Sequence, residues 1–260
     1  MFQCENCELL QIDPVNWLEE AYSDSIAITD TGLVARNVML VKRVVVLLSA
    51  LNVKIMVPIF FLRVFKKFLF SFLIMKMTPY KKVILDFGGG YGLLVRMLRD
   101  VGLNAFWNDL YTKNLLARGF EKTSIHYETI LSFEVMEHLE NPKLEFDKIF
   151  LEYKPEILLT STMNYGESIP SQDWWYYSFE TGQHITFYNS KTFELIARTY
   201  GYHYFSIDPT FHIFTKQKLN ENLIRFFVER SDFFFPNISG KYNSLTWADH
   251  EKMVDSIRHS

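Results

Sequence analysis

A run of glycines beside a carboxylate marks residues 83–92 as a candidate ligand site. The segment reads Val-Ile-Leu-Asp-Phe-Gly-Gly-Gly-Tyr-Gly. Its apolar start is typical of a buried parallel strand, and glycines remove side chains where a ligand must lie against the backbone. Apolar residues recur at helical spacing over Leu93–Val101, and Gly102 is expected to end that helix. A strand, a glycine turn and a helix N-terminus together predict a site for a nucleotide-like ligand.

The spacing of the glycines and the position of two acids narrow the choice of ligand. Gly88, Gly90 and Gly92 form G-x-G-x-G, whereas the dinucleotide fingerprint is G-x-G-x-x-G. Asp86 stands at the strand end, where a carboxylate would repel a pyrophosphate but would suit a ligand with an amino group and a sulfonium. Asp109 ends a second expected strand, at the place where an acid accepts ribose hydroxyls.

Further motifs follow in an order that resembles the class I S-adenosylmethionine-dependent methyltransferases. The glycine turn and Asp109 match the first two motifs of that family. Residues 129–139, which contain Glu-x-x-Glu-His, resemble its fourth strand and following helix. Residues 156–162 resemble the fifth strand, and residues 184–202 resemble the end of the branch that includes ubiquinone-type methylases. The resemblance covers roughly Tyr80 to Lys216.

The resemblance implies that S-adenosylmethionine is the cofactor. Asp86 would bind the amino group of the donor, and Asp109 would bind its ribose. Tyr91 would present its ring near the sulfonium, because a π-face attracts positive charge. Turn capping or ordinary packing is the alternative for each of these residues. The cofactor-binding residues expected from the resemblance are Asp86, Gly88, Gly90, Tyr91, Gly92, Asp109 and Glu134.

Two histidines are the candidates for a catalytic base. His184 follows a long polar and aromatic loop, residues 163–182, and is preferred over His138, which lies one turn beyond Glu134. Each histidine could instead serve only in packing. The aromatic residues Trp174–Tyr177 of the loop are expected either to wall an acceptor pocket or to anchor the loop. We assign no metal ion to this site.

Composition limits the class of protein and of partner. The chain has 260 residues, of which 48% are hydrophobic and 22% charged, as expected for one α/β domain with an accessory region. Its net charge of -3 argues against a nucleic-acid partner, so a small-molecule acceptor is expected. Cys4 and Cys7 have the spacing of half a zinc site, and we expect them to be reduced thiols in the remnant of an N-terminal zinc-binding module. We see no signal peptide and expect a cytoplasmic location.

Residues 44–77 are strongly apolar, but charges and a proline interrupt them. No uninterrupted run reaches the roughly 20 residues that a membrane span needs. We expect two helices that pack on the sheet edge and cover the cofactor site. The alternative is an amphipathic segment on a membrane surface, which would make the protein membrane-associated. The interrupting residues are Lys54, Pro58, Arg63, Lys66 and Lys67.

The expected fold is a Rossmann-like α/β domain with a mostly parallel seven-stranded sheet, helices on both faces and an N-terminal helical cap. The arm and cap would span residues 1–78, the S-adenosylmethionine-binding methyltransferase domain 79–216, and a C-terminal helical tail 217–260. The expected function is methyl transfer to a small-molecule acceptor. Similarity to the zinc-module branch implies a sugar or sugar nucleotide. The alternatives are a catalytically silent domain that binds an adenosyl ligand or a partner, and an NAD(P)-dependent oxidoreductase.

Overall fold

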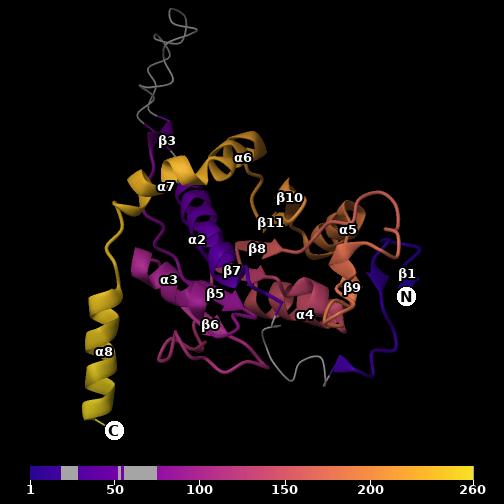
Figure 1. Cartoon of the computed structure of the whole chain (residues 1–260). Helices are drawn as coiled ribbons and strands as arrows, with labels where there is room; N and C mark the ends of the chain where they lie inside the picture. Colours follow the sequence, from indigo (N-terminus) through magenta and orange to yellow (C-terminus); the bar gives the residue numbers. More distant parts are fainter. Residues whose placement is uncertain (19–28, 52–53, 56–74, 260) are drawn as a thin grey trace, which may run out of the picture.

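The centre of the molecule is a mixed six-stranded sheet in the order β10-β11-β8-β7-β5-β6 (Figure 1). The computed structural model describes residues 1–18, 29–51, 54–55 and 75–259. Strands β6, β5, β7 and β8 run parallel to one another, and β11 is antiparallel to β8 and to β10. The strand bounds are β5 Ile84–Phe87, β6 Ala105–Asn108, β7 Thr129–Phe133, β8 Ile157–Ser161, β10 His203–Asp208 and β11 Phe211–Thr215.

The expected Rossmann-like sheet is confirmed, although a seventh strand is not formed among the described residues. At its place beside β6, one isolated parallel bridge joins Trp107 to Glu121. Residues 121–126, which follow this bridge, are all exposed, so this segment buries no apolar face that would hold a full strand.

Helices cover both faces of the sheet, as expected. Side chains of successive strand residues point to opposite faces. Accordingly, Ile84 packs on one face and Leu85 on the other. The first face carries α2 Leu33–Ala50, α3 Leu93–Val101, α6 Glu221–Glu229 and α7 Ser231–Ser239. The second face carries α4 Pro142–Asp147, the π-helical turn η4 Lys148–Tyr153 and α5 Ser190–Tyr200.

The predicted helix after the glycine turn agrees with the structure. Helix α3 spans Leu93–Val101, and Gly102 closes it at φ 116°, a conformation in which glycine has no Cβ to clash. The predicted helix from Ser190 to Tyr200 is also confirmed.

Helix α2 of the N-terminal region begins earlier in the chain than expected. It starts at Leu33, well before residue 44, and its residues 44–50 are buried. It packs in the same apolar cluster as α3 and α6, so it forms a layer of the main core. Residues 56–74, with Pro58, Arg63, Lys66 and Lys67, lie outside the described residues. In the described part of the chain, no helix is long and apolar enough to cross a membrane.

The other described strands form two small sheets. Strands β1 Phe2–Gln3 and β2 Leu10–Gln11 form a hairpin that pairs with β9 Thr186–Phe187. Strand β3 Lys54–Ile55 pairs with β4 Met75–Lys76. The hairpin turn carries Cys4 and Cys7, which form no disulfide.

The C-terminal segment is helical where it was expected to be, with α6 and α8 Thr246–Arg258, and it also contains α7. Helix α8 is tied to α3, because Asp249 accepts hydrogen bonds at 2.6 and 2.8 Å from the buried Arg99 guanidinium. Two short 3₁₀ turns, η3 Met136–His138 and η5 Trp175–Tyr177, lie at the carboxyl edge of the sheet and in the aromatic loop.

Candidate active site

Hydrogen bonds between the turn after β5 and the end of β6 hold the turn in place. The amides of Gly88 and Gly89 donate to the Asn108 carbonyl at 2.8 and 3.1 Å. Trp107 Nε1 donates to the Gly90 carbonyl at 2.7 Å. Gly90 has φ 52°, and a Cβ placed on it would meet no atom within 4 Å. The turn therefore presents bare backbone beside open space, as a bound ligand requires.

Asp86 lies directly beneath this turn and is 3% exposed. Its Oδ2 atom has no hydrogen-bond partner among the described residues. Burial, with a smaller contribution from Asp109, raises the pKa of the carboxyl to about 7. A buried carboxylate oxygen without a partner fits a ligand that brings a cationic amino group, as the methionine part of S-adenosylmethionine does.

Asp109 is already bound to backbone amides. Its Oδ2 accepts from Gly90 N at 2.9 Å, and its Oδ1 accepts from Tyr111 N at 2.8 Å and Thr112 N at 2.7 Å. A carboxylate has about four lone-pair sites, so capacity for a ribose hydroxyl remains. The carboxylate joins the turn after β6 to the glycine turn, which supports a positioning role beside the expected ribose contact.

Glu134 follows β7 at the carboxyl edge, the edge at which open α/β sheets hold ligands. Its φ of 56° is in the left-handed region, which is strained for a residue with a Cβ and is typical of functional turns. The Ser161 hydroxyl donates to Glu134 Oε1 at 2.6 Å, and Arg36 Nε lies 3.9 Å from Oε2. Burial and the nearby Glu137 raise the pKa of Glu134. The side chain is thus held in place and remains 35% exposed toward the edge.

His138 and His184 meet at this edge although 45 residues separate them in the chain. Their ring centroids are 5.0 Å apart. His138 Nδ1 lies 2.9 Å from the Gln183 carbonyl, and His184 Nδ1 lies 2.7 Å from the Tyr176 carbonyl. Because a carbonyl only accepts, each Nδ1 carries the proton. Burial, and next His184, lower the pKa of His138 to about 4, so its ring is neutral at physiological pH.

Glu137 completes a cluster that the sequence reasoning missed. It is 0% exposed, and Tyr176 donates its hydroxyl to Glu137 Oε1 at 2.8 Å. The Oε2 atom of Glu137 has no hydrogen-bond partner among the described residues. One ligand atom each of Glu137, His138 and His184 lies within 4.8 Å of the others. The Glu-x-x-Glu-His spacing was the available signal, since it places Glu137 next to His138.

The aromatic loop is largely anchored rather than open. Tyr176 and Tyr177 are buried against Phe187 and Leu10, while Trp175 is 70% exposed. The hydroxyl of Tyr176 reaches Glu137, so this ring supports the cluster. Only the exposed part of the loop could still wall an acceptor pocket.

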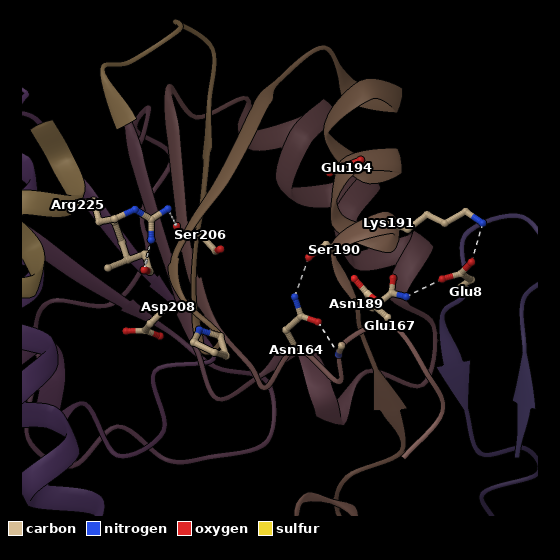
Figure 2. Close-up of a pocket in the computed structure, with 13 residues that line it drawn as sticks. Glu8, Asn164, Glu167, Asn189, Ser190, Lys191, Glu194, Ser206, Asp208 and Arg225 are labelled. Carbon is tan, nitrogen blue, oxygen red and sulfur yellow. Dashed lines mark hydrogen bonds and ion pairs between the residues drawn. The ribbon is translucent and has the colours of Figure 1, made fainter. Parts of the chain in front are cut away.

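A cavity of about 750 Å³ opens farther along the same edge of the sheet, and the glycine turn does not line it (Figure 2). Its floor includes Asn164, which follows β8, and the turn between β10 and β11. Strand β8 is two strands from β5, or about 10 Å at the usual strand spacing. The charged residues of its lining are Glu8, Glu167, Lys191, Glu194, Asp208 and Arg225.

Both basic side chains of the cavity lining already donate hydrogen bonds within the protein. Lys191 donates to Glu8 at 2.7 Å. Arg225 donates to the carbonyls of Ser206 and Ile207. The lining as a whole carries four acidic and two basic side chains, so its net negative charge suits hydroxyl or amino groups better than phosphates.

Comparison with known families identifies the chain. Residues 62–207 match the methyltransferase-domain family. The chain belongs to this family. The match confirms the expected methyltransferase with S-adenosylmethionine as its cofactor, and it decides against a nicotinamide-dependent oxidoreductase. The unpartnered Asp86 carboxylate and the open glycine turn fit this cofactor.

Several solved structures resemble the methyltransferase. The methyltransferase domain of bacterial CtHen1-C is 17% identical, with 53% of this chain and 90% of that chain covered and a TM-score of 0.36. An O-methyltransferase family protein from Burkholderia thailandensis is 14% identical, with 54% of this chain and 52% of that chain covered and a TM-score of 0.40. Magnesium protoporphyrin IX methyltransferase (ChlM) from Synechocystis PCC 6803 is 13% identical, with 52% of this chain and 73% of that chain covered and a TM-score of 0.37. No curated protein sequence matches the chain.

Proposed function

We propose that this methyltransferase transfers a methyl group to a hydroxyl of a small polyhydroxylated acceptor, such as a neutral or amino sugar. The acidic, amide-lined cavity at the carboxyl edge of the sheet carries this proposal. Hydroxyl and ammonium groups pair with carboxylates and amides, whereas a sugar nucleotide or a nucleic acid would bring phosphates toward the same carboxylates. The structure therefore favours the sugar over the sugar nucleotide.

The donor side would be held by the residues beneath and around the glycine turn. Asp86 would accept hydrogen bonds from the amino group of the donor, and the backbone at Gly88, Gly90 and Gly92 would contact its methionine part. Asp109 would accept from the ribose with its remaining lone pairs. S-adenosylmethionine supplies a methyl group that a sulfonium already activates, so the protein's main task is to align acceptor and donor.

The acceptor would be bound and activated by residues at the end of β7. His138 and His184 are the proposed catalytic residues, and Glu134 would orient the acceptor oxygen. All three lie at the edge between the glycine turn and the cavity, because β7 pairs with β5 on one side and with β8 on the other. Transfer to an oxygen is favoured because imidazoles and carboxylates are the groups that bind and activate a hydroxyl.

The test combines donor binding with a screen of acceptors. Purified protein would be titrated calorimetrically with S-adenosylmethionine, S-adenosylhomocysteine and NADH. The transfer of labelled methyl would then be measured to neutral sugars, amino sugars, sugar nucleotides and short RNA. We expect adenosyl binding without NADH binding, and transfer to one of the phosphate-free sugars.

A double variant examines the cavity. Glu167→Gln/Glu194→Gln should raise the KM for the acceptor and leave donor affinity unchanged, whereas Glu221→Gln, on the exposed start of α6, should change neither. Transfer only to RNA or to a nucleotide would refute the acceptor class. Donor binding without transfer to any acceptor would favour the catalytically silent alternative.

A further inference from the structure

We propose that Glu137, His138 and His184 bind one divalent transition-metal cation at the carboxyl edge of β7. One ligand atom from each residue lies within 4.8 Å of the other two. Metal bonds of about 2.1 Å in a tetrahedral site place ligand atoms about 3.4 Å apart. Side-chain movements of about 1 Å would therefore close the three ligands around an ion.

The buried carboxylate of Glu137 is the observation that calls for a cation. The residue is 0% exposed, and only its Oε1 atom has a partner, the Tyr176 hydroxyl at 2.8 Å. The Oε2 atom has none among the described residues. Leaving a carboxylate oxygen buried without a partner costs stability, and a bound cation would remove that cost. Arg36 interacts with Glu137 only through longer-range charge attraction, since its guanidinium forms hydrogen bonds with Asp30 at 2.7 and 3.1 Å.

The two imidazoles are oriented as metal ligands usually are. Each donates its Nδ1 proton to a backbone carbonyl, of Gln183 and of Tyr176 respectively. Such a bond to a carbonyl fixes both the tautomer and the ring orientation of a ligating histidine. Nε2 is then the ligand nitrogen of each ring. The carbonyl of Tyr176 orients His184 while its hydroxyl holds Glu137, so one residue of the aromatic loop supports two of the three ligands.

The ligand set indicates the kind of ion. Two imidazole nitrogens and one carboxylate oxygen suit first-row transition metals such as Mn²⁺, Fe²⁺, Co²⁺ and Zn²⁺ better than Ca²⁺ or Mg²⁺, which prefer oxygen ligands alone. Three protein ligands leave open positions for an exogenous oxygen. Glu134 is beside the site, so the open side would face the edge where ligands enter.

The role of the ion rests on the proposed function, although its binding does not. A cation at this place would hold the acceptor hydroxyl and lower its pKa. A metal-bound Nε2 has no lone pair left for a proton, so the two histidines would act on the hydroxyl through the ion.

Metal binding can be measured on the full chain without any acceptor. The protein would be freed of metal by a chelator, then titrated with Co²⁺, Mn²⁺, Zn²⁺ and Mg²⁺ by calorimetry and, for Co²⁺, by visible absorption. We expect one Co²⁺ or Mn²⁺ per chain and at least tenfold weaker Mg²⁺ binding. Glu137→Gln and His184→Asn should each weaken binding at least tenfold, whereas His126→Asn, in an exposed loop, should have no effect.

Two further variants keep the result interpretable. Cys4→Ser/Cys7→Ser should retain the Co²⁺ spectrum, because thiolates are not among the proposed ligands. Tyr176→Phe keeps all three ligands and should bind the ion, which separates ligand loss from a disturbed loop. Thermal unfolding would confirm that each variant is folded.

The outcomes separate this inference from the proposed function. Absence of stoichiometric metal binding, or equal binding by wild type, Glu137→Gln and His184→Asn, would overturn the metal site even if S-adenosylmethionine binds. Loss of the Co²⁺ spectrum in the cysteine variant would also overturn it. Metal binding as expected with no transfer to any sugar would refute the proposed acceptor alone.

Discussion

Replacing Asp86 by Asn should stabilise the ligand-free protein at alkaline pH while weakening its affinity for S-adenosylmethionine. Burial, and next the charge of Asp109, raise the pKa of the Asp86 carboxyl from 3.8 to about 7. A carboxyl with a raised pKa destabilises the fold above its unfolded pKa, because the unfolded state releases the proton first. The cost grows with pH and levels off above the folded pKa.

The magnitude follows from the two pKa values. At about 1.4 kcal/mol for each pKa unit, the cost is about 1.6 kcal/mol at pH 5 and about 4 kcal/mol at pH 8, to order of magnitude. Because Asp86 is 3% exposed, solvent screening reduces this little. Asn is isosteric with the protonated carboxyl and does not ionise. Its stability advantage over the wild type should therefore grow by roughly 2–3 kcal/mol between pH 5 and pH 8.

Urea unfolding of both proteins at several pH values would measure this difference. Asp232→Asn provides the control, since the Asp232 side chain is 85% exposed and should show no such pH dependence. The same titration with donor present should show that Asp86→Asn loses most of its ligand-induced stabilisation. A constant difference between wild type and Asp86→Asn from pH 5 to pH 8 would refute the reasoning.

Three other predictions concern the donor site and the C-terminal helix. Affinity for S-adenosylmethionine should rise as pH increases from 6 toward 7 and level off above about 7, since the bound amino group selects ionised Asp86. Calorimetry in buffers of different ionisation enthalpy should also detect the proton that Asp86 releases when the donor binds. Gly90→Ala should cost about 1 kcal/mol of stability and lower donor affinity at least tenfold, whereas Gly201→Ala, also at positive φ with open space, should cost similar stability and leave affinity unchanged. Asp249→Asn should cost about 3 kcal/mol at pH 7, because it leaves the buried Arg99 charge poorly paired. Burial opposes the effect, but the bonds from Arg99 lower the pKa of Asp249. Its contribution should therefore be present above its unfolded pKa and be lost as pH falls through its lowered folded pKa, as urea unfolding would show.

The local signals in the sequence predicted the strand β5, the glycine turn and helix α3 well. The strand, the glycine turn and helix α3 are contiguous, and their positions depend on backbone sterics and on apolar periodicity within about 20 residues. Asp86 was recognised by its place at a strand end, although its missing hydrogen-bond partner could be seen only in the structure. The early start of α2 was not predicted, because Val34, Val38 and Met39 are exposed apolar residues that obscure its pattern.

The cluster of Glu137, His138 and His184 depends on contacts that sequence periodicity does not encode. The sequence contained His138 and His184 as separate candidates, and only the tertiary structure brought their rings 5.0 Å apart. It also buried Glu137 beneath them and turned the Tyr176 hydroxyl toward it. The reason is physical: a strand or a helix forms from interactions between near neighbours, whereas this cluster exists because β7, β9 and the aromatic loop pack at one edge of the sheet. Local patterns were enough to predict the glycine turn and the fold class, whereas long-range packing brought the side chains of the cluster together.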